Sequence, residues 1–160
     1  MKITETDKKF IKRAIELSEQ GLGANAGGPF GAIVVKDGQI IAEGYNKVTS
    51  TNDPTAHAEM VAIREACKKL NSFQLDGCVI YTSCEPCPMC LGAIYWARPD
   101  AVYYACTKED AAQIGFDDQF IYEELDAAMD DRKIRFINLQ REEGNKVFRL
   151  WEEKEDKTEY

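Results

Sequence analysis

The sequence lacks any apolar run that approaches the roughly 20 residues needed to span a bilayer. Its first segment, MKITETDKKFIKRAIEL, has neither a continuous apolar core nor a small-residue cleavage site, so we expect no signal peptide and a cytoplasmic location. The sequence also lacks an excess of basic residues. It has 20 Lys and Arg and 28 Asp and Glu, which gives a net charge of -8. Since nucleic-acid-binding proteins usually carry a basic stripe, a polynucleotide partner is disfavoured, and no membrane partner is expected.

The sequence also lacks linkers, repeats and low-complexity tracts, and we interpret residues 1–160 as a single domain. Apolar residues make up 44% and charged residues 30%, a balance that allows a core without disulfide staples. In a reducing compartment cysteines stay reduced, so the clustered ones among the six are expected to be metal ligands or catalysts rather than bridges.

Hydrophobic periodicity and turn signals predict alternating helices and strands. The predicted helices cover about 4–21, 54–70, 86–97, 120–129 and 144–155, and the predicted strands cover 30–35, 39–44, 78–82, 101–105 and 134–140. The pair Asp37-Gly38 between the first two strands is a hairpin signal, and Asp53 is expected to cap the second helix. This order predicts an α/β fold, a three-layer α/β/α sandwich around a central mixed five-stranded sheet.

Three cysteines, Cys84, Cys87 and Cys90, lie three residues apart in the segment CEPCPMC, and the chain has one histidine, His57. His57 falls in the first turn of one predicted helix, and Cys87 and Cys90 fall in the first turn of another. Each of these helices follows a loop that leads from a predicted strand, so we expect their N-termini to converge at one edge of the sheet. The positive end of a helix dipole stabilises a thiolate placed there. Thiolate and imidazole ligands in tetrahedral geometry favour zinc.

Two kinds of zinc site remain open at this point. Cys84 as a fourth ligand would close a structural site in a zinc-stapled binding module, whereas a catalytic site keeps one position for water. Pro86 is expected to begin the helix after Cys84, which leaves Cys84 outside the chelating face. Glu59, two residues after His57, favours the catalytic site, because water that attacks a substrate needs a carboxylate to accept its proton.

The segments TAHAEM and TSCEPCPMC resemble the zinc-dependent nucleoside and nucleobase deaminase superfamily, whose signature is H-x-E…P-C-x-x-C. The resemblance implies a cytidine deaminase-like fold, one zinc ion per subunit on His57, Cys87 and Cys90, and Glu59 as the proton shuttle. Further segments, GGPFGAIVVKDG, NDPTAHAE and GFDDQFIYEE, resemble the bacterial guanine deaminases. That resemblance implies hydrolysis of guanine to xanthine and ammonia.

The same resemblance implies substrate contacts from Phe30, Asn46 and Asp118. Phe30 would stack on the purine plane, and Asn46 would hydrogen-bond the ring edge. Asp118 would bind the purine or carry protons to the leaving ammonia. Each residue also has an ordinary structural alternative: a core phenylalanine on a strand, an asparagine in a turn, and an aspartate that caps a helix.

Three further contacts follow from the resemblance alone. Ala58 and Trp96 are expected to line the substrate site, although Trp96 is equally suited to core packing. The segment of about 144–160 is expected to cross to a neighbouring subunit, where Tyr160 closes the site, which makes the protein a domain-swapped homodimer. Deaminases that act on guanosine, cytosine or tRNA adenosine remain alternatives, since single contacts set the choice of ring.

Overall fold

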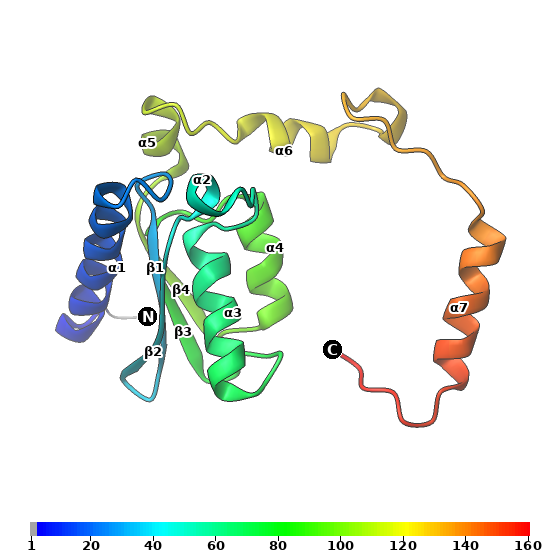
Figure 1. Cartoon of the computed structure of the whole chain (residues 1–160), viewed down its shortest axis with the longest axis horizontal. Helices are drawn as coiled ribbons and strands as arrows, with labels where there is room; N and C mark the ends of the chain where they lie inside the picture. Colours follow the sequence, from blue (N-terminus) through cyan, green and yellow to red (C-terminus); the bar gives the residue numbers. More distant parts are fainter. Residues whose placement is uncertain (1–2) are drawn as a thin grey trace. The chain divides into compact units, whose positions relative to one another are not determined.

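The computed structural model describes residues 3–160 and contains a four-stranded sheet in the order β2-β1-β3-β4 (Figure 1). The strands are β1 (Gly31–Lys36), β2 (Gln39–Tyr45), β3 (Cys78–Cys84) and β4 (Ala101–Cys106). Strand β1 pairs antiparallel with β2 and β3, whereas β3 and β4 run parallel. The sheet is therefore mixed, as predicted.

The hairpin between β1 and β2 turns at Asp37 and Gly38, as predicted. Both residues have positive φ, 50° and 73°, which is the backbone that a tight hairpin turn requires and that Asp-Gly supplies with little strain. Five consecutive residues of β1, Gly31–Val35, are buried, so both faces of this central strand are covered.

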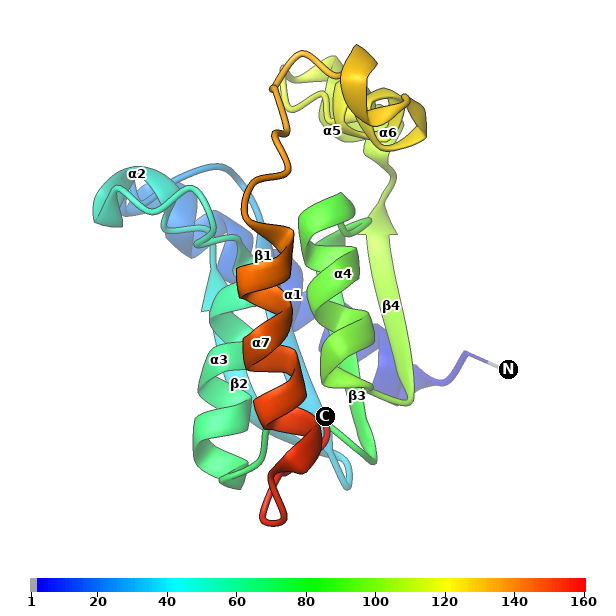
Figure 2. The ribbon, with the colours of Figure 1, turned by 90° about the vertical axis from the view of Figure 1, so that its right-hand side faces the viewer.

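Helices cover both faces of the sheet and complete the three predicted layers. Helix α1 (Glu5–Gly23) lies on one face, and α3 (Ala58–Leu70) and α4 (Pro88–Ala97) lie side by side on the other (Figures 1 and 2). Helix α1 packs very closely on β1, because a Cβ at Gly31 would lie 2.2 Å from the carbonyl oxygen of Ala14. Only glycine fits at that crossing.

The starts of α3 and α4 differ from the prediction. The prediction that Asp53 caps α3 is wrong, because the Asp53 carboxylate instead accepts hydrogen bonds from the Thr55 N–H at 2.8 Å and its hydroxyl at 2.6 Å. These bonds close a local turn, and α3 begins only after His57, its N-cap, which has extended backbone angles. Helix α4 also starts later than predicted, with Cys87 as its N-cap.

The predicted fifth strand, residues 134–140, is the one element that the described structure replaces with irregular chain. Its apolar side chains are largely exposed, with exposed fractions of 73% at Ile134 and 80% at Ile137. Alternating β-branched and aromatic residues favour a strand only where a partner strand accepts their backbone hydrogen bonds. The sheet has four strands because this segment pairs with none of them.

The chain divides into two compact units, one that ends at Asp118 and one that covers Gln119–Tyr160. The first unit holds the sheet and also α2 (Val48–Thr51) and α5 (Lys108–Gln113), two helices too short to show a periodic signal in the sequence. The second holds α6 (Gln119–Asp126), a short 3-10 helix (Met129–Asp131) and α7 (Arg141–Glu153). No helix within residues 3–160 is long and apolar enough to cross a membrane.

An ion pair between Arg13 and Glu43 links α1 to the edge strand β2. Two charge-assisted hydrogen bonds join the side chains, Nε to Oε1 and Nη2 to Oε2, both at 2.7 Å. The hydrogen bond from Arg13 lowers the pKa of Glu43 below its ordinary value of 4.5. This stabilisation therefore depends on the ionised carboxylate.

We expect Glu43→Gln to lower the free energy of unfolding by about 0.5–1 kcal/mol at neutral pH, a value reduced by the partial exposure of both side chains. Because the folded pKa lies below the unfolded one, the contribution is complete above pH 4.5 and is lost as the pH falls through the folded pKa. Urea unfolding at about pH 7 and about pH 3 measures this difference. An equal deficit at both pH values would contradict the assignment.

Candidate metal centre

Helices α3 and α4 each begin with a candidate metal ligand. His57 and Cys87 are the two N-cap residues, with extended backbone angles, and Cys90 lies in the first turn of α4. Neither residue makes the side-chain capping hydrogen bond that is typical of a serine or aspartate cap. The imidazole and the thiols face one another instead.

The geometry of these three side chains fits a zinc ion. The Nδ1 atom of His57 lies 3.5 Å from Sγ of Cys87 and 3.6 Å from Sγ of Cys90, and the three ligand atoms all lie within 4.8 Å of one another. In a tetrahedral site with Zn–N and Zn–S bonds of about 2.0 and 2.3 Å, the edge from nitrogen to sulfur is about 3.5 Å. The observed separations match that edge.

The electrostatics of the three groups also favour a cation. A hydrogen bond from the Cys90 thiol, followed by the interaction with His57, lowers the pKa of Cys87 to about 4. The same thiol contact raises the pKa of Cys90, and the hydrogen bond with Cys87 raises the pKa of His57. A thiolate is the form of cysteine that binds metals, and the lowered pKa of Cys87 favours that form.

Cys84 lies outside the ligand group. Its thiol donates a hydrogen bond to the carbonyl oxygen of Thr107 at 3.5 Å, and burial raises its pKa to about 12. Among residues 3–160, the group with metal-ligand spacing consists of His57, Cys87 and Cys90. Three protein ligands leave the fourth tetrahedral position open, which is the arrangement of catalytic zinc sites.

The Glu59 carboxylate lies beside this group and is almost completely buried. Its Oε1 accepts a hydrogen bond from the Thr82 hydroxyl at 3.2 Å, and its Oε2 accepts one from the Cys90 thiol at 3.5 Å. Burial is the main cause that raises the pKa of Glu59. A buried carboxylate with a raised pKa is well suited to accept and return a proton near neutral pH.

A cavity of about 550 Å³ opens beside His57, and Phe30 and Asn46 also line it. This volume lies within the range of small-molecule sites. A larger groove of about 820 Å³ over β2 and α3 contains none of the ligand residues and is lined by charged side chains such as Arg64 and Glu65. The cavity beside His57 is therefore the candidate substrate site.

The orientation of Asn46 in this cavity is fixed by its surroundings. Its Oδ1 accepts a hydrogen bond from the Val48 backbone N–H at 3.1 Å, so its NH2 group is the part of the amide that remains to donate. A Cβ at Gly27 would lie 2.0 Å from the same Oδ1, so a larger residue at position 27 would displace the amide. Asn46 is thus both a turn residue and a cavity residue.

Residues 4–106 match the cytidine and deoxycytidylate deaminase zinc-binding region. The chain belongs to this deaminase family. The guanine deaminase of Bacillus subtilis (strain 168) is 58% identical over 151 residues, which cover 94% of this chain and 97% of that protein. An X-ray structure of guanine deaminase from Bacillus subtilis superimposes with a TM-score of 0.94 at 56% identity and covers 99% of both chains. The tRNA-specific adenosine deaminase of Aquifex aeolicus (strain VF5) is 46% identical over 94 residues, 59% of this chain and 57% of that protein.

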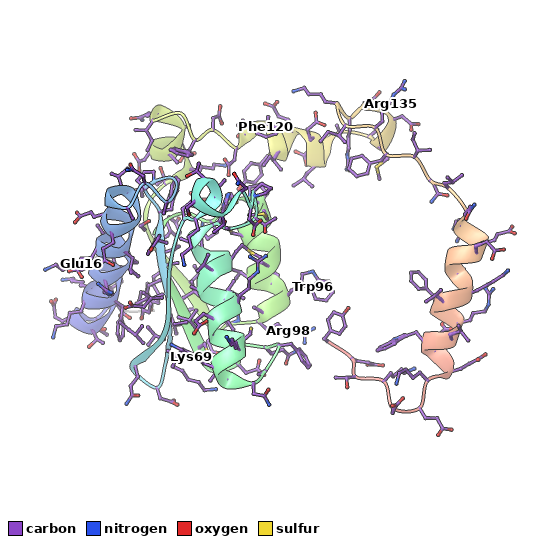
Figure 3. All side chains as sticks on the ribbon, viewed as in Figure 1. Glu16, Lys69, Trp96, Arg98, Phe120 and Arg135 are labelled. Atoms are coloured by element: carbon purple, nitrogen blue, oxygen red, sulfur yellow. The ribbon has the colours of Figure 1, made fainter. Side chains whose placement is uncertain are left out.

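This membership confirms the predicted deaminase fold, whereas the individual substrate contacts stay predictions. Ala58 is buried at the first position of α3, directly after His57. Asp118 ends the first unit, and burial followed by the charge of Cys87 raises its pKa. Trp96 lies near the far end of α4, points away from the helix (Figure 3), and is 63% exposed. Tyr160 ends the second unit and is largely exposed.

Three residues of this deaminase site did not emerge from the sequence as individual functional candidates. Gly27 sets the room around Asn46, Thr82 holds the Glu59 carboxylate, and Phe116 lines the cavity. The segments GGPF and GFDDQF, which resemble guanine deaminase segments, contain Gly27 and Phe116 and so pointed to these regions. The contacts of Gly27, Thr82 and Phe116 join residues far apart in the chain, so sequence spacing alone does not predict them.

The ligand set predicts a clear difference among three substitutions in the zinc-loaded deaminase. We expect Cys87→Ser and Cys90→Ser to lose bound zinc, because each removes a thiolate ligand. Cys84→Ser is the matched control and should keep about one zinc per chain. Atomic absorption on purified protein measures the ratio. Zinc loss in Cys84→Ser, with the other two variants loaded, would instead indicate that Cys84 is a ligand.

Proposed function

We propose that this protein hydrolyses guanine to xanthine and ammonia. The similarity to a guanine deaminase over nearly the whole of both chains carries the proposal. It is supported by the open three-ligand group, the buried Glu59 and the cavity beside them. In the reaction the C–N bond to the exocyclic amino group breaks, and a C–O bond to the water oxygen forms.

His57, Cys87 and Cys90 would hold the zinc ion. When bound there, zinc supplies the Lewis acidity that makes water a nucleophile at neutral pH. Glu59 accepts a proton from that water on a carboxylate oxygen and delivers it to the ring nitrogen beside the carbon under attack. The Thr82 hydroxyl, which donates to Oε1 of Glu59, keeps the carboxylate turned toward the ligand group.

The walls of the cavity would orient a flat purine. Phe30 offers its ring for stacking, and Asn46 donates from its NH2 group to an acceptor on the ring edge. Asp118 accepts from the ring N–H and the exocyclic amine, or carries protons to the ammonia that leaves. Its raised pKa suits a proton carrier.

Other substrates of the same chemistry are guanosine, cytosine and tRNA adenosine. The tRNA-specific relative aligns with little more than half of this chain, and a net charge of -8 gives weak attraction for an anticodon arm. A structural zinc module is a different class of function. The position of Cys84 outside the ligand group disfavours it.

We further propose that the enzyme is a cytoplasmic homodimer and that residues 1–160 form a single domain. The C-terminal segment of that domain, about 144–160, crosses to the partner subunit. Helix α7 supports a partner contact, because several large apolar side chains on it are exposed: Val147, Phe148, Leu150 and Trp151. Apolar patches of this kind are typical of interfaces. In that arrangement Tyr160 closes the partner's substrate site.

Ammonia release from guanine tests the proposal directly. Zinc-loaded wild type should release ammonia and form xanthine, followed by its ultraviolet absorbance. Glu59→Gln removes the proton acceptor but keeps the size of the side chain, so turnover should fall by about 100-fold or more. Bound zinc should be unchanged, because Glu59 is not among the three ligands. Wild type that is folded, loaded with zinc and inert toward guanine would overturn the substrate, and guanosine, cytosine and tRNA adenosine would be assayed next.

Removal of Tyr160 tests the role of the C-terminal segment. We expect kcat/KM for guanine to fall by about tenfold, since the site loses a wall that excludes water. Zinc content should stay the same. Equal kcat/KM values for the full-length and truncated proteins would mean that the last residue takes no part in the reaction.

A further inference from the structure

Phe116 forms a second aromatic wall in the cavity beside His57. It lies in the loop after α5, and its ring meets that of Phe30 edge to face, with 5.0 Å between centroids and an interplanar angle of 89°. This is a favoured geometry for aromatic pairs, because the positive edge of one ring faces the negative face of the other. The two rings together form a corner of the cavity.

Gly28 provides the space in which this corner forms. A Cβ at Gly28 would lie 2.9 Å from Cζ of Phe116 and 2.9 Å from Cε2 of Phe30. Such contacts are shorter than van der Waals distance, so one or both rings would have to turn. Gly28 is not among the described glycines with positive φ, so space rather than backbone conformation requires glycine here.

The backbone around Phe116 directs its ring into the cavity. Gly115 has a φ of 92°, a backbone conformation that glycine adopts readily, and the Phe116 N–H donates to the carbonyl oxygen of Ala111 at 3.0 Å. Asp118 follows two residues later in the same segment. The position of Phe116 therefore also restricts where the backbone places Asp118.

We propose that Phe116, seated on Gly28, is a positioning residue that fixes the plane of the Phe30 ring for a flat purine base. This inference rests on the proposed deamination of guanine and adds a residue that determines substrate binding. An edge-to-face neighbour restricts rotation of the Phe30 ring before the base arrives. Less freedom is then lost on binding, so the contribution belongs to substrate affinity rather than to bond cleavage.

Variants on both sides of the contact test the proposal in zinc-loaded, full-length enzyme. Phe116→Leu removes the ring edge. Phe116→Tyr places a hydroxyl on Cζ, in the space that a Cβ at Gly28 would take, and Gly28→Ala fills that space from the other side. For each variant we expect KM for guanine to rise about tenfold while kcat changes by less than about threefold. Calorimetric titration with 8-azaguanine, a purine analogue of guanine, should show a matching loss of binding affinity in each variant.

Matched controls separate this effect from a general loss of structure. Gly23→Ala adds a methyl group where no atom outside its own helix lies within 4 Å, and Phe73→Leu removes a half-exposed ring in the turn after α3. Both should leave KM, kcat and zinc content unchanged. Thermal unfolding of every variant shows whether the fold is retained, and Phe116→Leu remains informative if Gly28→Ala fails to fold.

A double variant gives the sharpest outcome. In Gly28→Ala/Phe116→Leu the shorter side chain leaves room for Phe30 to move away from the added methyl group, so KM should be lower than in Gly28→Ala alone. If the wild type is active and Gly28→Ala and Phe116→Leu each have the same KM as the controls, the proposed role of Phe116 is overturned. A wild type that releases no ammonia from guanine would overturn the proposed function instead, and the affinity for 8-azaguanine would still report on the aromatic corner.

Discussion

The contacts of 3.5 and 3.6 Å between Nδ1 of His57 and the sulfur atoms of Cys87 and Cys90 join the N-termini of α3 and α4. The sheet sets up this meeting. Strands β3 and β4 run parallel, so α4, which connects them, must begin at the end of β3. Helix α3 lies beside α4 on the same face and brings its own N-cap to that edge. The site exists because two helix starts share one edge of the sheet.

The charges at this edge determine one another. Glu59 is buried next to the Cys90 thiol, and burial of a charged carboxylate costs free energy unless a cation compensates or the carboxylate takes up a proton. The burial that raises the pKa of Glu59 also makes it useful as a proton carrier. Thr82, on the neighbouring strand β3, provides the hydrogen bond that holds the carboxylate in place. Binding of a cation and transfer of a proton thus depend on one small group of side chains.

Small residues on the approach to β1 give the cavity its shape. Gly27 leaves room for the amide of Asn46, Gly28 leaves room for the rings of Phe30 and Phe116, and Gly31 lets α1 reach the sheet. At each of these positions a Cβ would meet another atom of the chain within 3 Å. The lack of a side chain at these glycines therefore allows both the close packing of the first unit and the space for a flat ligand.

The sequence by itself determined the chemistry of the metal centre. The one histidine, the spacing of Cys87 and Cys90 and the nearby Glu59 were sufficient. Periodicity and the Asp37-Gly38 turn signal predicted the hairpin, the five longer helices and four strands. Only the tertiary structure decided where α3 begins and denied residues 134–140 a partner strand. It confirmed the prediction that Cys84 lies outside the ligand group. It also brought Phe116 to Phe30. Ligand chemistry and periodicity are local properties of the chain, whereas strand pairing, burial and ring contacts depend on residues that only folding brings together.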